Sequence, residues 1–358
     1  MATLQHLRKR IDALDRSLLE LLNQRGKLVQ SVGALKLKNG QGVFVPGRER
    51  ALLARLKAHN NGPLSDQAVE NLFLEIVHTC RHLQKQLKVS YFGPEASFSH
   101  AAALKSFGRG AVLVPARTIS EVFAEVDKNR ADFGVVPIEN STGGGVYHTL
   151  DMFIESPLSI CAELELPVHH YLLGRTAGSL DKVRTLFSHY QALAQCRKWI
   201  DAHLPRARVV ESTSTSEAAQ QAARVPGAAA IASKLAADRY ELQILASRIE
   251  DSARNYTRFL VIGTAEPQPT GRDKTSIMFS IKDRPGALFD MLLPFKKYKL
   301  NLTKIESRPT RQKAWEYIFF VDFDGHRSEP RVQKALGRLE PSCLFLKILG
   351  SYPRTGES

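Results

Sequence analysis

The sequence is poor in residues that could hold a fold together through disulfides or metals. Four cysteines occur among 358 residues, at positions 80, 161, 196 and 343. They stand singly, without a CxxC pair or histidines at ligand spacing, which excludes a disulfide framework and gives no indication of a zinc site. We therefore expect reduced, packed thiols, no metal and no other cofactor.

Long apolar runs are also missing. No stretch approaches the roughly 20 apolar residues of a membrane-spanning helix, and the first residues lack the pattern of a secretory signal peptide. The length of the chain and its 43% hydrophobic content are sufficient for several packed cores. We expect a soluble, multidomain, cytoplasmic protein that does not bind a membrane.

Acidic residues are in the minority, so the net charge is +14. The excess is concentrated in residues 1–88, which hold 15 Lys and Arg against 7 Asp and Glu. Such a surplus suits nucleic acid or small anions. Aromatic side chains, on which bases could stack, are scarce in this segment, which contains only Phe44 and Phe73. The favoured partner is a small anion, and we expect no nucleic acid.

One long helix is predicted over Thr3–Lys38, about 54 Å from end to end. Arg25 interrupts its seven-residue apolar repeat, and a buried arginine is costly without an anion. Lys36 lies almost three turns further on the same face, whereas Arg8 lies seventeen residues earlier, about 25 Å away. Arg8 therefore cannot serve the same site within one chain. The apolar repeat occupies positions 4, 7, 11, 14, 18, 21, 28, 32 and 35.

Two further helices are predicted, one beginning near "RERALLARL" and one from about Ser65 to Leu87 with Gln84 in its apolar stripe. Together with "LRKRIDALDRSLLELLNQRGKLVQSVGALK", these stretches resemble the small all-helical chorismate mutase domain. The resemblance implies a domain-swapped dimer in which the partner chain contributes Arg8. Val45 stands where several relatives carry an acid, so one contact to the substrate hydroxyl is in question. The implied binding set is Arg8, Arg25, Lys36, Arg48, Glu49 and Gln84, with Arg25, Lys36 and Gln84 as its catalytic members.

The chemistry of such a domain requires no nucleophile and no metal. Chorismate becomes prephenate by a pericyclic rearrangement. The protein needs to hold a dicarboxylate in a compact conformer and to stabilise charge on the breaking ether oxygen. Arginine and lysine side chains suit both tasks.

From Val89 to about Gly263, short apolar strands alternate with helices. The alternation predicts an α/β fold with a mainly parallel sheet, in two lobes with a ligand between them at strand ends. Four polar stretches stand out, and each alone fits an ordinary helix cap or strand start. Their occurrence together indicates a site for an anion. The stretches are "FGPEASFSHAAA", "VVPIENSTGGGV", "VVESTSTSEAA" and "NYTRF".

These stretches resemble prephenate dehydratase, whose characteristic "TRF" is here Thr257-Arg258-Phe259. The resemblance implies that Thr257 donates a proton or hydrogen bond to the leaving ring hydroxyl as carbon dioxide departs. Ala96 departs from the glycine that is usual in the family, and "SHYQ" at 188–191 departs from the common "SHPQ". By resemblance the catalytic set is Thr257, Glu139, Asn140, Glu211 and Gln195, and the substrate-binding set is Ser97, Ser99, Asn140, Ser141, Ser188, Ser212 and Thr213.

A polar linker, "AEPQPTGRDK" at 265–274, precedes a third pattern in the order βαββαβ, which is the ferredoxin-like arrangement. A chain truncated after Glu266 is therefore expected to retain the capacity for dehydration. With "RPGAL" at 284–288 and "ESRP" at 306–309, the segment resembles an ACT domain, which binds phenylalanine between paired domains. The implied ligand residues are Gly286, Ala287, Leu288, Glu306, Ser307, Arg308 and Pro309.

The resemblances cover nearly the whole chain and predict three domains. These are an all-helical mutase domain at 1–88, a two-lobed α/β dehydratase domain of the periplasmic-binding-protein type at 89–266, and an α+β ferredoxin-like ACT domain at 274–352. We expect a homodimer or higher oligomer that converts chorismate to prephenate and then to phenylpyruvate under feedback by phenylalanine. The alternative is a non-catalytic amino-acid sensor, against which Thr257 and Glu139 argue. A nucleic-acid binder is a weaker third interpretation.

Overall fold

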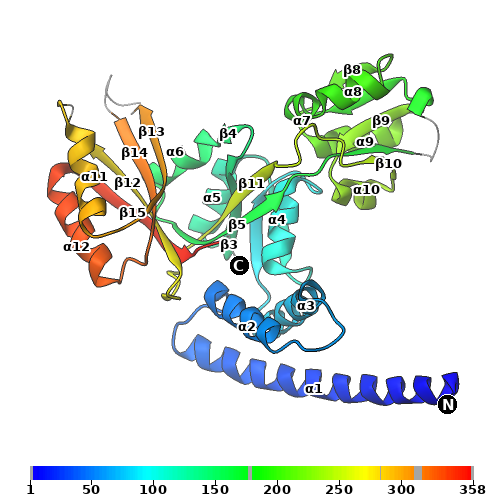
Figure 1. The fold of residues 1–358 in the computed structure, drawn as a ribbon, viewed down its shortest axis with the longest axis horizontal. Coiled ribbons are helices and arrows are strands. Elements are labelled where there is room, and N and C mark those ends of the chain that lie inside the picture. The colour runs from blue at the N-terminus through cyan, green and yellow to red at the C-terminus, as the bar shows by residue number, and fades with distance from the viewer. Residues whose placement is uncertain (1–2, 176–179, 283, 310–316, 356–358) are drawn as a thin grey trace. The chain divides into compact units, whose positions relative to one another are not determined.

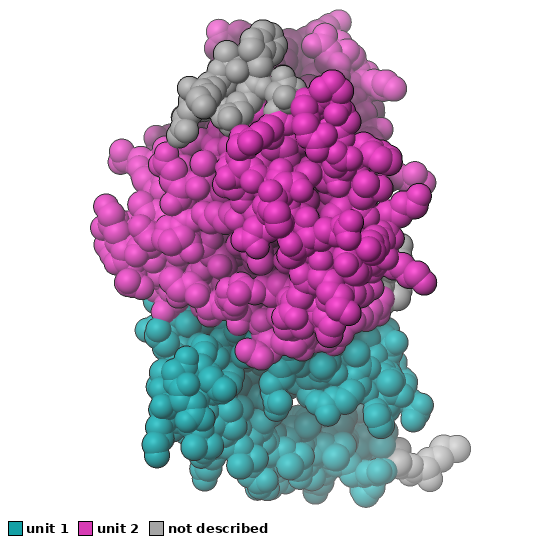
Figure 2. Space-filling model, turned by 90° about the vertical axis from the view of Figure 1, so that its left-hand side faces the viewer, with its two compact units in different colours: residues 1–87, 107–112 teal, residues 88–106, 113–358 magenta. Residues whose placement is uncertain are grey.

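The computed structural model describes residues 3–175, 180–282, 284–309 and 317–355. Residues 310–316, which belong to the segment predicted to have the βαββαβ order, lie outside these ranges. The chain forms two compact units, residues 1–87 with 107–112 and residues 88–106 with 113–358, which Figure 2 distinguishes by colour. Within the described ranges, no helix combines the length and the apolarity needed to cross a membrane.

Unit 1 contains three helices, α1 (Leu4–Lys38), α2 (Pro46–Ala58) and α3 (Asp66–Gln84) (Figure 1). Helix α1 is continuous over 35 residues, as the apolar repeat predicts. Side-chain caps fix two helix starts, because Thr3 accepts from the backbone N–H of His6 and Ser65 from that of Ala68. Helix α3 ends at Gln84, three residues before the predicted end, since Lys85 is already extended toward the next strand.

Glycines let α1 approach α3 closely. A Cβ built on Gly33 would lie 2.8 Å from Cγ of Gln84, and one built on Gly26 would lie 3.3 Å from Leu83. In contrast, every residue of α1 from Thr3 to Gln24 is exposed. The apolar stripe of this half, including Leu14 at 64% exposure, therefore has no cover from the described part of its own chain.

Unit 2 begins with a two-lobed α/β region. The first lobe has the sheet order β2-β1-β3-β11-β5, with the short β4 paired to β3, and the second has the order β10-β6-β9-β7-β8. The first lobe comprises β1 (Lys88–Phe92), α4 (Phe98–Phe107), β2 (Val112–Ala116), α5 (Ile119–Asp127), β3 (Phe133–Asn140), β4 (Gly144–Gly145), α6 (Tyr147–Glu155), β5 (Ser159–Pro167) and β11 (Tyr256–Gly263). The second comprises β6 (Tyr171–Gly174), η1 (Leu180–Lys182), β7 (Thr185–Ser188), α7 (Tyr190–Gln195), α8 (Arg197–His203), β8 (Arg208–Glu211), α9 (Thr215–Arg224), β9 (Ala228–Ala232), α10 (Lys234–Tyr240) and β10 (Gln243–Ser247).

The sheets are mixed, which corrects the expectation of mainly parallel strands. Strands β1 and β3 are parallel, as are β7, β8 and β9. However, β11 runs antiparallel to both β3 and β5, and β6 runs antiparallel to β9 and β10. Parallel neighbouring strands need a crossover connection. The chain instead leaves the first lobe after β5 and returns to it as β11 directly from the second lobe, and β11 therefore runs antiparallel to its neighbours.

The C-terminal part of unit 2 confirms the βαββαβ order. Its four strands form an antiparallel sheet, β13-β14-β12-β15. Helices α11 and α12 cover one face (Figure 1), where Phe279, Phe295 and Phe323 are buried. The elements are β12 (Asp273–Ile281), α11 (Ala287–Lys297), β13 (Leu302–Pro309), β14 (Tyr317–Asp324), α12 (Pro330–Leu339), η2 (Glu340–Ser342) and β15 (Cys343–Pro353).

The other face of this sheet packs on the first lobe. Phe320 and Leu349 of the C-terminal sheet belong to one buried cluster with Phe153, Val136 and Leu260 of the α/β region. The polar linker therefore joins two domains that share a hydrophobic core, and the C-terminal domain is not an independent appendage.

Candidate active sites

The helical unit brings three of the predicted mutase residues into one electrostatic neighbourhood. Arg48 and Glu49 both act on Lys36, and burial, followed by the charge of Arg48, lowers the pKa of Lys36. Burial raises the pKa of Glu49 even though Arg81 lies beside it. Arg25 and Gln84 each hold a buried polar atom, Nη1 and Oε1, that has no hydrogen-bond partner among the residues that the structure describes.

Arg81 is a member of this cluster that the sequence did not suggest. Its side chain is 2% exposed and donates to Glu49 Oε1 at 2.5 Å. The guanidinium also lies over the rings of Phe44 and Phe107, 5.0 and 5.8 Å from their centroids. An Arg in the last turn of a helix is ordinarily a solvated charge, so no signal in the sequence distinguished it. The cluster combines several cations with a single carboxylate and suits a small dianion.

Two further positions of the helical unit bear on the mutase site, Arg8 and Val45. Arg8 lies on the exposed half of α1, seventeen residues before Arg25 and so about 25 Å from it along the axis. Val45 is the N-cap residue of α2 and makes no side-chain capping bond. Within the described part of its own chain, nothing brings Arg8 to the cluster formed by Lys36, Glu49 and Arg81.

In the α/β region, Thr257 and Asn140 form the centre of a polar cluster. They face each other across β11 and β3, and Asn140 Nδ2 donates to Thr257 Oγ1 at 2.9 Å. The other amide atom, Asn140 Oδ1, accepts from Thr142 Oγ1 at 2.7 Å and from Gly143 N at 2.8 Å. The amide is held on both sides, and Thr257 accepts from it while keeping its own proton for another acceptor.

Gln195 joins this cluster from the second lobe. It donates to Thr142 Oγ1 at 2.8 Å and accepts from Asn255 at 3.0 Å. His170 Nε2 lies 2.8 Å from Gln195 Oε1, and burial lowers the pKa of this histidine, so the neutral ring donates its Nε2 proton. Thr142, Asn255 and His170 were not predicted, because asparagine, threonine and histidine in loops carry no distinctive pattern.

Glu139 does not belong to the same face as Thr257. The pairing of β11 with β3 shifts between Arg258 and Phe259, which marks a bulge on the β3 side. Glu139 pairs with Arg258, the neighbour of Thr257 on β11, and its carboxylate lies 2.9 Å from Lys304 of the C-terminal domain. Because successive side chains of a strand leave opposite faces, Glu139 points away from the face that Asn140 and Thr257 share. That Glu139 and Thr257 act on one substrate stays a prediction, and in this chain their side chains leave opposite faces of the sheet.

The remaining predicted residues of the second lobe lie at the ends of β7 and β8. Glu211 pairs with Ser188 across the two strands. Ser188 is fully buried and donates to the carbonyl of Ile231 at 2.8 Å, which is a structural role. Ser212 donates to Gln221, and Thr213 bonds to Glu217 through both its N–H and its hydroxyl.

Some polar groups of the stretch at the start of α4, which is predicted to bind an anion, make structural contacts. Ser97 accepts from the N–H of His100 at 3.2 Å and so caps the helix, and Ser99 is buried. Ala96 has φ of 62°, in the left-handed region that favours glycine, which explains why glycine is usual there. Ser141 bridges to β11, since its hydroxyl donates to Arg254 O and accepts from Tyr256 N.

The C-terminal domain contains a cavity of about 270 Å³ at the start of α11. Gly286, Ala287 and Leu288 line it together with Tyr317 and Phe319 of β14. Gly286 has φ of +79°, a conformation that suits glycine. These three residues of the predicted phenylalanine set therefore lie together.

The other predicted segment, "ESRP", divides between the two faces of β13. Ser307 pairs with Phe319 and Pro309 with Tyr317, so these two residues neighbour the cavity-lining strand. Glu306 and Arg308 point to the opposite face, where Glu306 lies 3.2 Å from Lys304 and Arg308 pairs with Asp151 of α6 at 2.9 Å. Within one chain, the seven predicted residues do not form one pocket.

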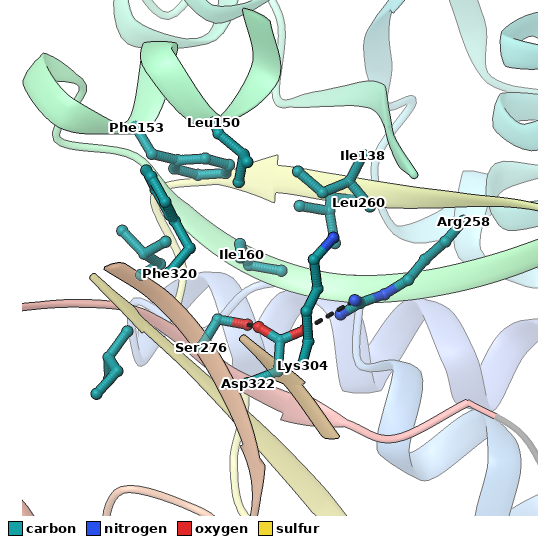
Figure 3. A pocket seen from close by; sticks show the side chains of 12 residues that line it. Ile138, Leu150, Phe153, Ile160, Arg258, Leu260, Ser276, Lys304, Phe320 and Asp322 are labelled. Atoms are coloured by element: carbon teal, nitrogen blue, oxygen red, sulfur yellow. Dashed lines mark hydrogen bonds and ion pairs between the residues drawn. The ribbon is translucent and has the colours of Figure 1, made fainter. Parts of the chain in front are cut away.

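Arg258 is not among the predicted site residues, although it is the middle residue of "TRF". Its guanidinium lies 2.7 Å from Asp322 and 2.8 Å from Glu163. Figure 3 shows Arg258, Lys304 and Asp322 among the side chains around a cavity of about 20 Å³, which is too small for a substrate. Burial alone would raise the pKa of Glu163, but Arg258 and Lys274 outweigh it and the pKa falls.

The fold and these clusters define a multidomain enzyme with separate helical and α/β sites and a C-terminal ligand-binding domain. Family models agree with this division. The model of chorismate mutase type II matches residues 7–85, that of prephenate dehydratase 89–267 and that of the ACT domain 275–341.

Relatives share the whole arrangement. The bifunctional chorismate mutase/prephenate dehydratase of Aquifex aeolicus is 47% identical over 358 residues, 99% of each chain. That of Pseudomonas aeruginosa is 45% identical and covers 98% of each. The structure of prephenate dehydratase in complex with L-Phe from Arthrobacter aurescens has a TM-score of 0.70 and 35% identity, covering 75% of this chain and 90% of the other. The chain belongs to the bifunctional chorismate mutase/prephenate dehydratase family, with an isomerase domain, a lyase domain and an ACT domain.

Proposed function

We propose that the chain converts chorismate to prephenate in its helical domain and prephenate to phenylpyruvate in its α/β domain, as a step of phenylalanine biosynthesis. The proposal for the second reaction depends above all on one observation. Thr257 accepts a hydrogen bond from a fixed asparagine amide and so keeps its own proton available for another acceptor. A proton donor aimed in this way suits the departure of a ring hydroxyl.

In the dehydratase site, Thr257 acts as the proton donor and Asn140 aims it. Gln195 closes the cluster from the second lobe, and Glu211 and Thr213 offer polar groups to the substrate from the end of β8. Ser97, Ser99, Ser141, Ser188 and Ser212 have structural contacts or buried positions, and we assign them the role of shaping the site. Carbon dioxide and water leave together, and aromatisation of the ring drives the step.

In the mutase site, Arg25, Lys36 and Arg48 bind the two carboxylates of chorismate, and Gln84 with Glu49 faces the ether and hydroxyl oxygens. The partnerless Nη1 of Arg25 and Oε1 of Gln84 support this assignment, because buried polar atoms are costly until a ligand satisfies them. Val45 removes one acidic contact that several relatives have. The fixed arrangement of charge lowers the barrier without a covalent intermediate.

Arg8 acts in the site of a second copy. The uncovered apolar stripe between Thr3 and Gln24 supports a dimer in which α1 lies across its partner. The association of such dimers into a higher oligomer remains a prediction. The domain limits at 1–88, 89–266 and 274–352 and the cytoplasmic location also remain predictions.

Phenylalanine is the proposed regulator, and the cavity beside Gly286, Ala287 and Leu288 is its proposed site. The cavity is rimmed by Tyr317 and Phe319, which suit an aromatic side chain, and Gly286 admits close approach of a ligand backbone. Ser307 and Pro309 lie beside this site, whereas Glu306 and Arg308 hold β13 against the α/β domain.

One assay tests the proposal as a whole. The protein should form phenylpyruvate from chorismate, pass through free or bound prephenate, and slow when L-phenylalanine is added. Binding of phenylalanine without either reaction would favour the amino-acid sensor instead.

A further inference from the structure

Lys304 connects the ACT domain to the ladder that holds the dehydratase site. It lies on β13, is only 14% exposed, and its ammonium group donates to Glu139 Oε2 at 2.9 Å. Glu306 on the same strand lies 3.2 Å from this ammonium group. The pair therefore joins two domains whose limits are separated by the linker at 265–274.

The position of Glu139 gives this contact its significance. Glu139 pairs with Arg258, directly beside the bulge of β3 at Ile138, and the next pair along the ladder is Asn140 with Thr257. Fixing the carboxylate of Glu139 fixes the end of β3, and with it the amide that bonds to the Thr257 hydroxyl. An error of about 1 Å in such an aim can cost on the order of 10²-fold in rate.

The surroundings of Lys304 favour a defined geometry over a loose surface contact. Arg258 Nη1 lies 3.9 Å from Glu139 and is anchored by Asp322, so Glu139 meets cations from two sides. Figure 3 shows Lys304 among the largely buried side chains between the two sheets. An ion pair with additional partners in a partly buried site is held more firmly than an exposed one.

We propose that Lys304 is a positioning residue for prephenate dehydration, supplied by the ACT domain and acting through Glu139 on Asn140 and Thr257. The inference rests on the proposed role of Thr257. Glu139 is then part of the support of the site rather than a group that contacts substrate. The same strand carries Ser307 and Pro309 beside the cavity on its other face, so a displacement of β13 would be felt at Glu139.

The test compares full-length variants by their steady-state kinetics with prephenate, without phenylalanine. Lys304→Met keeps the stem of the side chain and removes its charge, and Lys304→Arg restores a charge. Asp151→Asn is the matched control, because it weakens the pairing of Arg308 with α6 across the same domain contact without touching Glu139. The melting temperature of each variant reports whether the α/β and ACT domains are folded.

We expect Lys304→Met to lower kcat about tenfold or more with less than a threefold change in KM, and Lys304→Arg to recover most of the loss. Asp151→Asn should stay within twofold of the parent protein. In a Glu139→Gln background, Lys304→Met should add little, since both changes break the same pair.

Three results would overturn the inference. One is an unchanged kcat in Lys304→Met while Glu139→Gln and Thr257→Val are impaired, which leaves the proposed function intact. Another is an equal loss of kcat in Asp151→Asn and Lys304→Met, which would mean that the pair of Lys304 with Glu139 only holds the two domains together. The third is full activity of Thr257→Val, which would remove the proposed function on which the inference rests.

Discussion

Thr257 and Arg258 are neighbours on β11, yet they serve opposite faces of the sheet. The Thr257 hydroxyl accepts from Asn140, whereas the Arg258 guanidinium bonds to Asp322 of the ACT domain. Successive side chains of a strand alternate between its faces, so one three-residue motif can carry the proton donor and anchor the regulatory domain behind it. The two contacts are thus made from a single backbone segment.

The first prediction concerns the Thr257 hydroxyl. Thr257→Val keeps the branched shape but leaves no proton donor and no acceptor for the Asn140 amide, so dehydratase kcat should fall at least ~10²-fold. Mutase turnover, which depends on residues of unit 1, should stay within twofold. A parallel loss of both activities at an unchanged melting temperature would contradict the separation of the two sites.

The second prediction concerns the dependence of the α/β domain on the ACT domain, and it reverses the expectation from the linker. Truncation after Glu266 would remove Asp322, Lys274 and Tyr352 and leave Arg258 and Glu163 without most of their partners. Breaking one side of a buried ion pair costs about 3 to 5 kcal/mol. The truncated protein should aggregate or melt well below the full chain in a thermal scan. A soluble, fully active truncated enzyme would show that this network does not stabilise the domain.

Much of the fold could be predicted from sequence because local patterns specify it. Two examples are the long helix α1, predicted from its seven-residue repeat, and the βαββαβ order. Both depend on residues close in the chain, and both are present in the structure. The strand direction around β11 could not be predicted, since it depends on where the chain returns from the second lobe.

The site was only partly predictable for the same reason. Thr257, Asn140 and Gln195 meet as the resemblance implies. The ion pair of Glu139 with Lys304, and the burial of Arg81 beside Glu49, arise from contacts between distant segments. A polar residue in a motif says nothing by itself about the face from which its side chain leaves.

The third prediction concerns the proposed phenylalanine cavity. Gly286→Ala places a methyl group at a residue with φ of +79°, which costs about 1 to 2 kcal/mol and closes the approach to the backbone. The strain lowers stability with and without ligand, whereas the blocked approach weakens binding, so the phenylalanine concentration for half inhibition should rise about tenfold, which corresponds to a loss of about 1.4 kcal/mol of binding free energy. The matched control is Gly337→Ala in α12, where a built Cβ meets nothing within 4 Å and alanine favours the helix. Identical inhibition curves for the two variants would place the ligand elsewhere.

The fourth prediction concerns stability at mildly acidic pH. Burial, followed by the charges of Arg81 and His82, lowers the pKa of His78 to about 4 from the usual 6.5. The unfolded chain then binds more protons than the folded chain below about pH 6.5, so the free energy of unfolding falls as the pH decreases from 6.5 to 4. From pH 7 to pH 5 this group alone should cost about 2 kcal/mol.

His78→Gln should remove this part of the pH dependence. Urea unfolding of the parent and variant proteins at pH 7, 6 and 5 measures it, and the comparison at each pH cancels the contributions of other titrating groups. A constant difference in free energy across the three pH values would mean that His78 is not held neutral in the folded protein.

The last prediction concerns the origin of Arg8 in the mutase site. Arg8 and Arg25 are seventeen residues apart on one continuous helix, about 25 Å, and cannot both reach a ligand roughly 10 Å long. If each site takes Arg8 from the partner chain, Arg8→Ala and Arg25→Ala proteins should both lack mutase activity as homodimers, while their dehydratase activity persists.

Mixing the two variants should restore activity. In a heterodimer both defects fall in one site, and the other site keeps both arginines. Random reassortment makes about half of the dimers mixed, each with one intact site of two, so co-refolding should recover roughly a quarter of the parent mutase activity. Subunit exchange is verified with differently tagged chains. Exchange without recovery would mean that Arg8 acts within its own chain or takes no part in the site, and the exposed half of α1 would then need another partner.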